Sequence, residues 1–170
     1  MEFLLSFPKC QRMPCLLIVG ESNYGKSRII RRFLDLHPSY DNPDGRTIVA
    51  PVVMAGAPSV PDEGRLFNNI LYSIFAAYKV NDHPDVKRKI IFEAFSAIGV
   101  KMLIFDDISN LMAGSVIKQR QVLNAVRSLS ADLQIPIVAA GIETANIVMR
   151  TDAQLYSRFK SRELKRWTNE

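Results

Sequence analysis

The sequence has few of the residues that build disulfide frameworks, metal clusters or membrane spans. Two cysteines (Cys10 and Cys15) and two histidines occur among 170 residues, and their spacing matches neither a disulfide framework nor a zinc site. No apolar run reaches the roughly 20 residues that cross a bilayer, and the first residues lack the basic leader of a signal peptide. These absences favour a cytoplasmic protein with no membrane association.

The composition is that of an ordinary globular protein. Apolar residues make up 48% and charged residues 23% of the chain, and 170 residues are enough for one domain, 1–170, with a sizeable core. The formal net charge is +5, which permits binding to nucleic acid without establishing it. No helix-turn-helix pattern occurs, so we do not expect this domain to read bases.

The most informative motif occupies residues 20–27, which read GESNYGKS and follow the apolar run Cys15–Val19. This order of strand, glycine-rich turn and helix is typical of a nucleotide phosphate loop. Gly20 and Gly25 allow the backbone N–H groups to approach phosphate oxygens, and Lys26 supplies a positive charge for the β- and γ-phosphates. The residues expected to contact the nucleotide are Gly20, Glu21, Ser22, Asn23, Tyr24, Gly25, Lys26, Ser27 and Arg28. The alternative is an ordinary glycine-containing turn.

A second motif, Met102–Asp107, has four apolar residues followed by two carboxylates. It predicts a buried parallel strand of the Walker B type. Asp106 would hold Mg²⁺ together with the hydroxyl of Ser27, and Asp107 would orient or deprotonate the attacking water. Many ATPases carry glutamate at the second position, so the shorter Asp107 suggests slow hydrolysis or hydrolysis that needs a partner. The alternative for both acids is a turn or helix cap after a core strand. The cofactors predicted are ATP and Mg²⁺.

Strand and helix patterns alternate along the chain, which predicts an α/β fold with a parallel sheet covered by helices on both faces. The order expected for the five strands, numbered along the chain, is 5-1-4-3-2, with the ligand at their carboxyl ends. The strands expected are Cys15–Val19, Thr47–Met54, Lys101–Phe105, Ile135–Ala140 and the edge strand Arg162–Trp167. The helices expected are Gly25–Leu36, Asp62–Tyr78, Asp85–Ile98, Ser115–Leu133 and Glu143–Met149.

The chain resembles the AAA+ ATPase domain of the TniB family, bacterial transposition ATPases related to TnsC. The residues that carry the resemblance are Met13–Ser27, Ala57–Ser59, Phe105–Leu111, Ile135–Ala145 and Leu155–Phe159. The phosphate loop is common to all P-loop ATPases, and the stretches around Asp106 and Gly141 favour this family.

The resemblance implies an AAA+ core, here without the helical lid that follows it in that class. It implies ATP hydrolysis, with Lys26, Asp107 and Arg158 as the catalytic residues. Arg158 resembles an arginine finger that reaches the γ-phosphate of a neighbouring subunit, and this implies a homo-oligomer. The alternative for Arg158 is a solvated surface arginine. The implied partners are double-stranded DNA, a transposase and a target-selection protein.

Two other functions are compatible with the motifs. One is a helicase-loader-like or signalling P-loop ATPase with no role in transposition, and the other is a nucleotide-binding interaction module that hydrolyses little. Glu143 and Thr144 are weak candidates for a nucleotide sensor, the alternative being a helix N-cap. The basic residues of the last segment are candidates for contacts with DNA phosphates.

Overall fold

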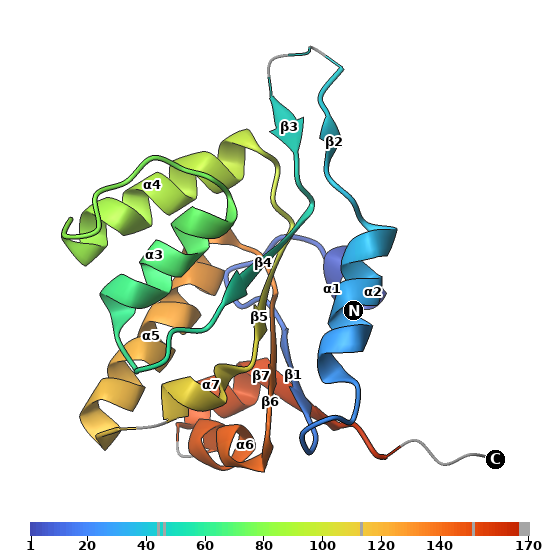
Figure 1. The fold of residues 1–170 in the computed structure, drawn as a ribbon, viewed down its shortest axis with the longest axis vertical. Helices are drawn as coiled ribbons and strands as arrows, with labels where there is room; N and C mark the ends of the chain where they lie inside the picture. The colour runs from blue at the N-terminus through green and yellow to red at the C-terminus, as the bar shows by residue number, and fades with distance from the viewer. Residues whose placement is uncertain (44, 46, 113, 151, 167–170) are drawn as a thin grey trace.

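A five-stranded parallel sheet forms the centre of the fold (Figure 1). The computed structural model describes residues 1–166 except 44, 46, 113 and 151. The sheet order is β4-β5-β6-β1-β7. The bounds are Cys15–Val19 for β1, Val52–Gly56 for β4, Met102–Asp106 for β5, Ile137–Gly141 for β6 and Phe159–Glu163 for β7.

In these labels the order differs from the expected 5-1-4-3-2 because a two-stranded hairpin, β2 (Tyr40–Asp41) and β3 (Ile48–Val49), adds two labels before β4. Numbered within the five-stranded sheet alone, the order from the β7 edge reads 5-1-4-3-2.

The central strands are apolar because both of their faces are covered. In β5, Leu103 and Phe105 point into one core, while Met102 and Ile104 point into the core on the opposite face. The helices α3 (Glu63–Ser73), α4 (Pro84–Ala97) and α5 (Val116–Leu133) cover the first face (Figure 1). The other face is covered by α2 (Lys26–Leu36) and by the short α1 (Glu2–Leu5).

Three further helical segments lie in the connections between strands. The 3₁₀ helix η1 (Ile108–Met112) follows β5, and α6 (Glu143–Arg150) and α7 (Ala153–Arg158) lie between β6 and β7. Both α6 and α7 bury apolar side chains in the first core. Among the described residues, no helix is both long enough and apolar enough to cross a membrane.

The predicted strand Thr47–Met54 is wrong at Pro51. The chain forms the hairpin strand β3 before this proline and the sheet strand β4 after it. Proline has no N–H to donate to a strand ladder, and the carbonyl oxygen of Pro51 instead accepts from Lys101 and Met102.

Two other predicted boundaries differ from the structure by three residues or more. The helix expected to reach Tyr78 ends at Ser73, because Phe75 adopts a left-handed φ of 54° and the N–H of Ala76 bonds to the carbonyl oxygen of Leu71. The last strand begins at Phe159 and not at Arg162, and Trp167 lies outside the described residues.

Candidate functional site

Residues 20–27 form the turn from β1 into α2, at the carboxyl edge of the sheet. Asn23 has a φ of 65° and Gly25 a φ of 91°, both in the left-handed region. Such a backbone bends so that consecutive N–H groups converge on one point, which is a binding geometry for anions. The loop therefore has the backbone shape that a phosphate group requires.

The start of α2 differs from the starts of four other helices. In α3, α4, α5 and α7 a side chain accepts a hydrogen bond from a backbone N–H of the first turn. In α2 the N-cap residue is Gly25, no side-chain cap bond forms, and the first turn contains no acid. The first N–H groups of this helix thus remain available to an anionic ligand, which the positive end of the helix dipole also attracts.

Lys26 points back across the loop. Its Nζ donates to the carbonyl oxygens of Gly20, at 2.7 Å, and of Glu21, at 2.8 Å. The ammonium group is therefore fixed beside the loop N–H groups and within the reach of a phosphate bound there.

Gly20 is required where the loop begins. A Cβ at this position would lie 2.9 Å from the carbonyl oxygen of Leu164, a distance that real Cβ atoms do not adopt. Leu164 continues β7 and donates its N–H to the carbonyl oxygen of Val19, and the N–H of Gly20 donates to Gly141 at the end of β6. The loop is thus held between the ends of β6 and β7.

The carboxylates predicted as the second motif lie at the same edge of the sheet. In the strand register, Phe105 is opposite Ala139, and Ala139 is opposite Leu17. One residue further along each strand, Asp106 is level with Ile18, two strands away and so about 10 Å to the side. Asp106 is half-buried, and Asp107 is exposed with a left-handed φ of 55°. Register and topology therefore bring Asp106 and Asp107 to the edge where the phosphate loop begins.

At this edge of the sheet, Mg²⁺ would take ligands from a bound nucleotide as well as from the protein. No cluster of three or more histidine, cysteine or acidic side chains that could hold a metal occurs in the described part of the chain. The hydroxyl of Ser27, which is exposed, and the carboxylate of Asp106 are oxygen ligands of the type Mg²⁺ prefers. Mg²⁺ usually combines one or two such groups with phosphate oxygens and water, so this donor set fits the ion.

Arg158 is not part of this edge. It precedes Phe159, which is opposite Cys15 at the start of β1, whereas the loop begins after Val19 at the end of β1. The five residues of β1 separate the two positions by about 16 Å. The structure therefore brings Lys26, Ser27, Asp106 and Asp107 to one edge of the sheet and leaves Arg158 at the opposite edge.

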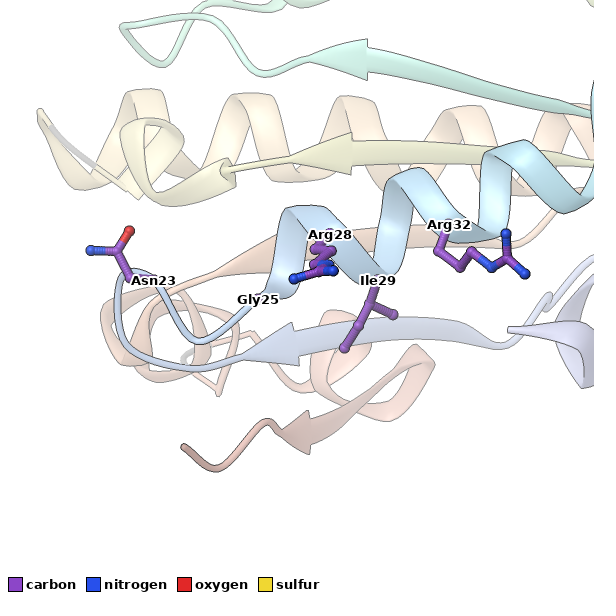
Figure 2. Close-up of a pocket in the computed structure, with 5 residues that line it drawn as sticks. All are labelled: Asn23, Gly25, Arg28, Ile29 and Arg32. Atoms are coloured by element: carbon purple, nitrogen blue, oxygen red, sulfur yellow. The ribbon is translucent and has the colours of Figure 1, made fainter. Parts of the chain in front are cut away.

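A cavity of about 660 Å³ lies beside the phosphate loop along α2 (Figure 2). Among the described residues it is lined by Asn23, Gly25, Arg28, Ile29 and Arg32. The four helix-side positions are three or four residues apart and so share one face of α2. The volume is within the range of small-molecule binding sites. The sequence pattern predicted Arg28 as a nucleotide contact but missed Ile29 and Arg32. Their helical spacing from Gly25 was the feature of the sequence that could have indicated them.

The two sensor candidates lie at the start of α6. Glu143 begins α6 and accepts a hydrogen bond from Asn146 at 2.8 Å, and Thr144 is exposed. The polar group at the tip of β6 comes instead from η1, where the hydroxyl of Ser109 accepts from the N–H of Ile142 at 3.1 Å. Ser109 thus joins the ends of β5 and β6, and the sequence pattern did not identify it.

Together, the parallel sheet, the phosphate-loop motif and the acid at the end of β5 define an α/β fold with the arrangement of a nucleotide phosphate site. The chain belongs to the bacterial TniB family, because the model described as "Bacterial TniB protein" matches residues 1–169. A search of curated proteins finds no match.

Solved structures with a similar fold include ORC and Cdc6 proteins. The ORC2 protein of Aeropyrum pernix, solved as ADPNP-ADP complexes, has a TM-score of 0.66 and 16% identity, and the match covers 96% of this chain and 44% of that chain. The ORC1 protein of A. pernix in complex with DNA has a TM-score of 0.62 and 14% identity, with 92% and 40% covered. Cdc6p from Pyrobaculum aerophilum has a TM-score of 0.57 and 15% identity, with 94% and 41% covered. This chain thus spans less than half the length of these proteins, and at these identities the likeness concerns the fold.

Proposed function

We propose that this protein is an ATP-binding AAA+ ATPase that regulates DNA transposition. The observation that carries the ATP-binding part is the uncapped start of α2 at the sheet edge where Asp106 ends β5. Membership of the TniB family supports the role in transposition.

In this proposal the loop 20–27 holds the triphosphate through backbone N–H groups and the ammonium of Lys26. Ser27 and Asp106 hold Mg²⁺, which when bound neutralises charge on the phosphate oxygens. Asp107, exposed at the end of β5, orients the attacking water or takes a proton from it. The side chain of aspartate is one methylene shorter than that of glutamate, so we expect slow turnover in the isolated protein.

The cavity along α2 has room for the remainder of the nucleotide. It begins at Asn23 and Gly25, where the phosphates would lie, and continues past Arg28 and Ile29 to Arg32 (Figure 2). Ile29 offers an apolar surface to a base, and the guanidinium groups of Arg28 and Arg32 attract the phosphates.

ATP also joins subunits in this proposal. Because Arg158 lies at the sheet edge opposite its own phosphate loop, it can act as an arginine finger only on the nucleotide of a second copy. A guanidinium in that position stabilises the charge that builds on the transferred phosphoryl group. The resulting homo-oligomer is the form that binds double-stranded DNA and recruits a transposase and a target-selection protein.

Exposed cations support contact with DNA phosphates. Lys160 and Arg162 are exposed on the edge strand β7, and Lys118 and Arg120 are exposed at the start of α5. Phosphate contacts of this kind do not depend on base sequence. They weaken as the salt concentration rises, because the counterions that binding releases from DNA then gain less entropy.

The test is sedimentation of the purified protein with duplex DNA of unrelated sequences, with and without ATP and Mg²⁺. We expect ATP-dependent multimers on each DNA, with an affinity that falls steeply between 50 and 200 mM salt, by roughly 10-fold or more. Monomers that bind neither ATP nor DNA would contradict the proposal. Multimers that form normally but do not bind a transposase would favour a helicase-loader-like role.

A further inference from the structure

Two arginines end the two short helices that connect β6 to β7, and they lie in different surroundings. Arg150 is the last residue of α6, and Arg158 is the last residue of α7. Both belong to the segment from which the proposed oligomer would take a cation for the neighbouring subunit.

Arg158 lies on the inner face of α7. It is three residues from Leu155, whose side chain is fully buried, and this spacing puts both residues on one side of the helix. The Nη1 atom of Arg158 is buried and has no hydrogen-bond partner among the described residues. Its charge also acts on the buried thiol of Cys15. Burial raises the pKa of this thiol, and the positive charge of Arg158 lowers it in part. The guanidinium of Arg158 is thus directed into the fold.

Arg150 is exposed, and an aromatic ring holds it. Its guanidinium carbon lies 5.9 Å from the ring centroid of Tyr156, which is within the range of a cation–π contact. Tyr156 is 52% exposed and follows the buried Leu155, so it projects from the outer side of α7. The ring limits the rotamers of Arg150 and leaves the charge accessible to another molecule.

A second exposed arginine is anchored to the same short helix, α7, as the ring that holds Arg150. Arg12 is also exposed at this surface, and its Nη2 donates to the hydroxyl of Ser157 at 2.8 Å. The nearby carboxylate of Asp152 already accepts the N–H groups of Gln154 and Leu155 as the N-cap of α7. The feature of the proposed nucleotide site that would attract this cation from another copy is the bound triphosphate, whose negative charge Lys26 and Mg²⁺ neutralise only in part.

We propose that Arg150, oriented by the ring of Tyr156, is a second cation that acts in trans and contacts the triphosphate bound by a neighbouring copy. The inference rests on the proposed ATP-bridged oligomer and adds to it the residue that is already directed outward. Tyr156 is then a positioning residue, which acts through Arg150.

The first experiment measures ATP-dependent assembly on duplex DNA and ATP turnover for single variants of the full chain. Arg150→Ala should lower both by about 10-fold or more, while the affinity of its own site for ATP stays within about twofold. Arg150→Lys should recover part of the loss, Tyr156→Phe should retain the wild-type values, and Tyr156→Ala should fall between. The matched controls are Arg65→Ala and Tyr72→Ala, an exposed arginine and an exposed tyrosine on α3.

The second experiment mixes two variants that each have low turnover. A Lys26→Ala copy keeps Arg150 but lacks the phosphate-binding lysine, and an Arg150→Ala copy keeps its own nucleotide site. If Arg150 acts in trans, the mixture recovers turnover that neither variant has alone. The inference would be overturned if the mixture recovered no turnover. It would also be overturned if Arg150→Ala had wild-type turnover while Arg158→Ala had none. A wild-type protein that never assembles with ATP would instead refute the proposed oligomer, and the inference with it.

Discussion

Replacing Lys26 with alanine tests the phosphate loop directly. The Lys26 ammonium is within 2.8 Å of two loop carbonyl oxygens, so it is fixed beside the N–H groups proposed to hold phosphate. We expect Lys26→Ala to lower ATP affinity while leaving the fold intact.

The size of the effect follows from two opposing contributions. A lysine charge about 4 Å from a phosphate charge near the protein surface is worth about 4 kcal/mol. Binding the phosphate weakens the two bonds to Gly20 and Glu21, and a hydrogen bond to a charged group contributes about 1.5–3 kcal/mol. If one such bond is given up, a net loss of about 1–2.5 kcal/mol remains. This corresponds to an affinity about 5- to 60-fold lower.

The assay is a titration of each variant with a fluorescent ATP analogue in the presence of Mg²⁺, with thermal unfolding measured in parallel. Lys89→Ala is the matched control, because Lys89 is an exposed lysine on α4 whose ion pair is with Glu93, one turn further along that helix. The reasoning would be refuted if Lys26→Ala bound the analogue as tightly as wild type, or if Lys89→Ala lost as much affinity.

Three further outcomes follow from the structure. Gly20→Ala should lower the free energy of unfolding by about 1–3 kcal/mol in urea titrations because its methyl group would overlap a backbone oxygen, whereas Gly56→Ala, with open space around it, should not. Asp107→Asn should lower ATP turnover about 100-fold, while its ATP affinity in the fluorescent-analogue titration changes less than twofold. Turnover equal to that of the wild type would exclude a role of Asp107 in proton transfer. The ordinary pKa of a cysteine thiol is 9.0, and burial raises the pKa of Cys15 in the folded chain. Above about pH 9 the folded chain therefore keeps a proton that the unfolded chain loses. The free energy of unfolding should then fall as pH rises. Urea titrations at pH 8 and pH 10 should show this loss in the wild type but a smaller one in Cys15→Ala.

The sequence could predict the parts of the fold that depend on local pattern. The runs Cys15–Val19 and Met102–Asp106 are apolar and end in polar motifs, so both the strands and the sheet edge that they share follow from the chain itself. Asp106 is level with Ile18 because β5 and β1 both pair with β6. Topology rules for parallel sheets predict this pairing from the order of the elements.

Other features depended on contacts between distant residues. The start of β7 at Phe159 is set by pairing with Cys15, which no local pattern in the last segment contains. The inward direction of Arg158 depends on α7, a helix of six residues that is too short to show a helical period in the sequence. The same limit hid the pairing of Arg150 with Tyr156, because those residues belong to two different helices.

The most direct test of the nucleotide site is a crystal structure of the protein with a non-hydrolysable ATP analogue and Mn²⁺ in place of Mg²⁺. Our account predicts an anomalous Mn²⁺ peak between the hydroxyl of Ser27 and the carboxylate of Asp106, with the phosphates against the N–H groups of residues 20–27. A nucleotide bound elsewhere, or a metal peak distant from Asp106, would contradict it.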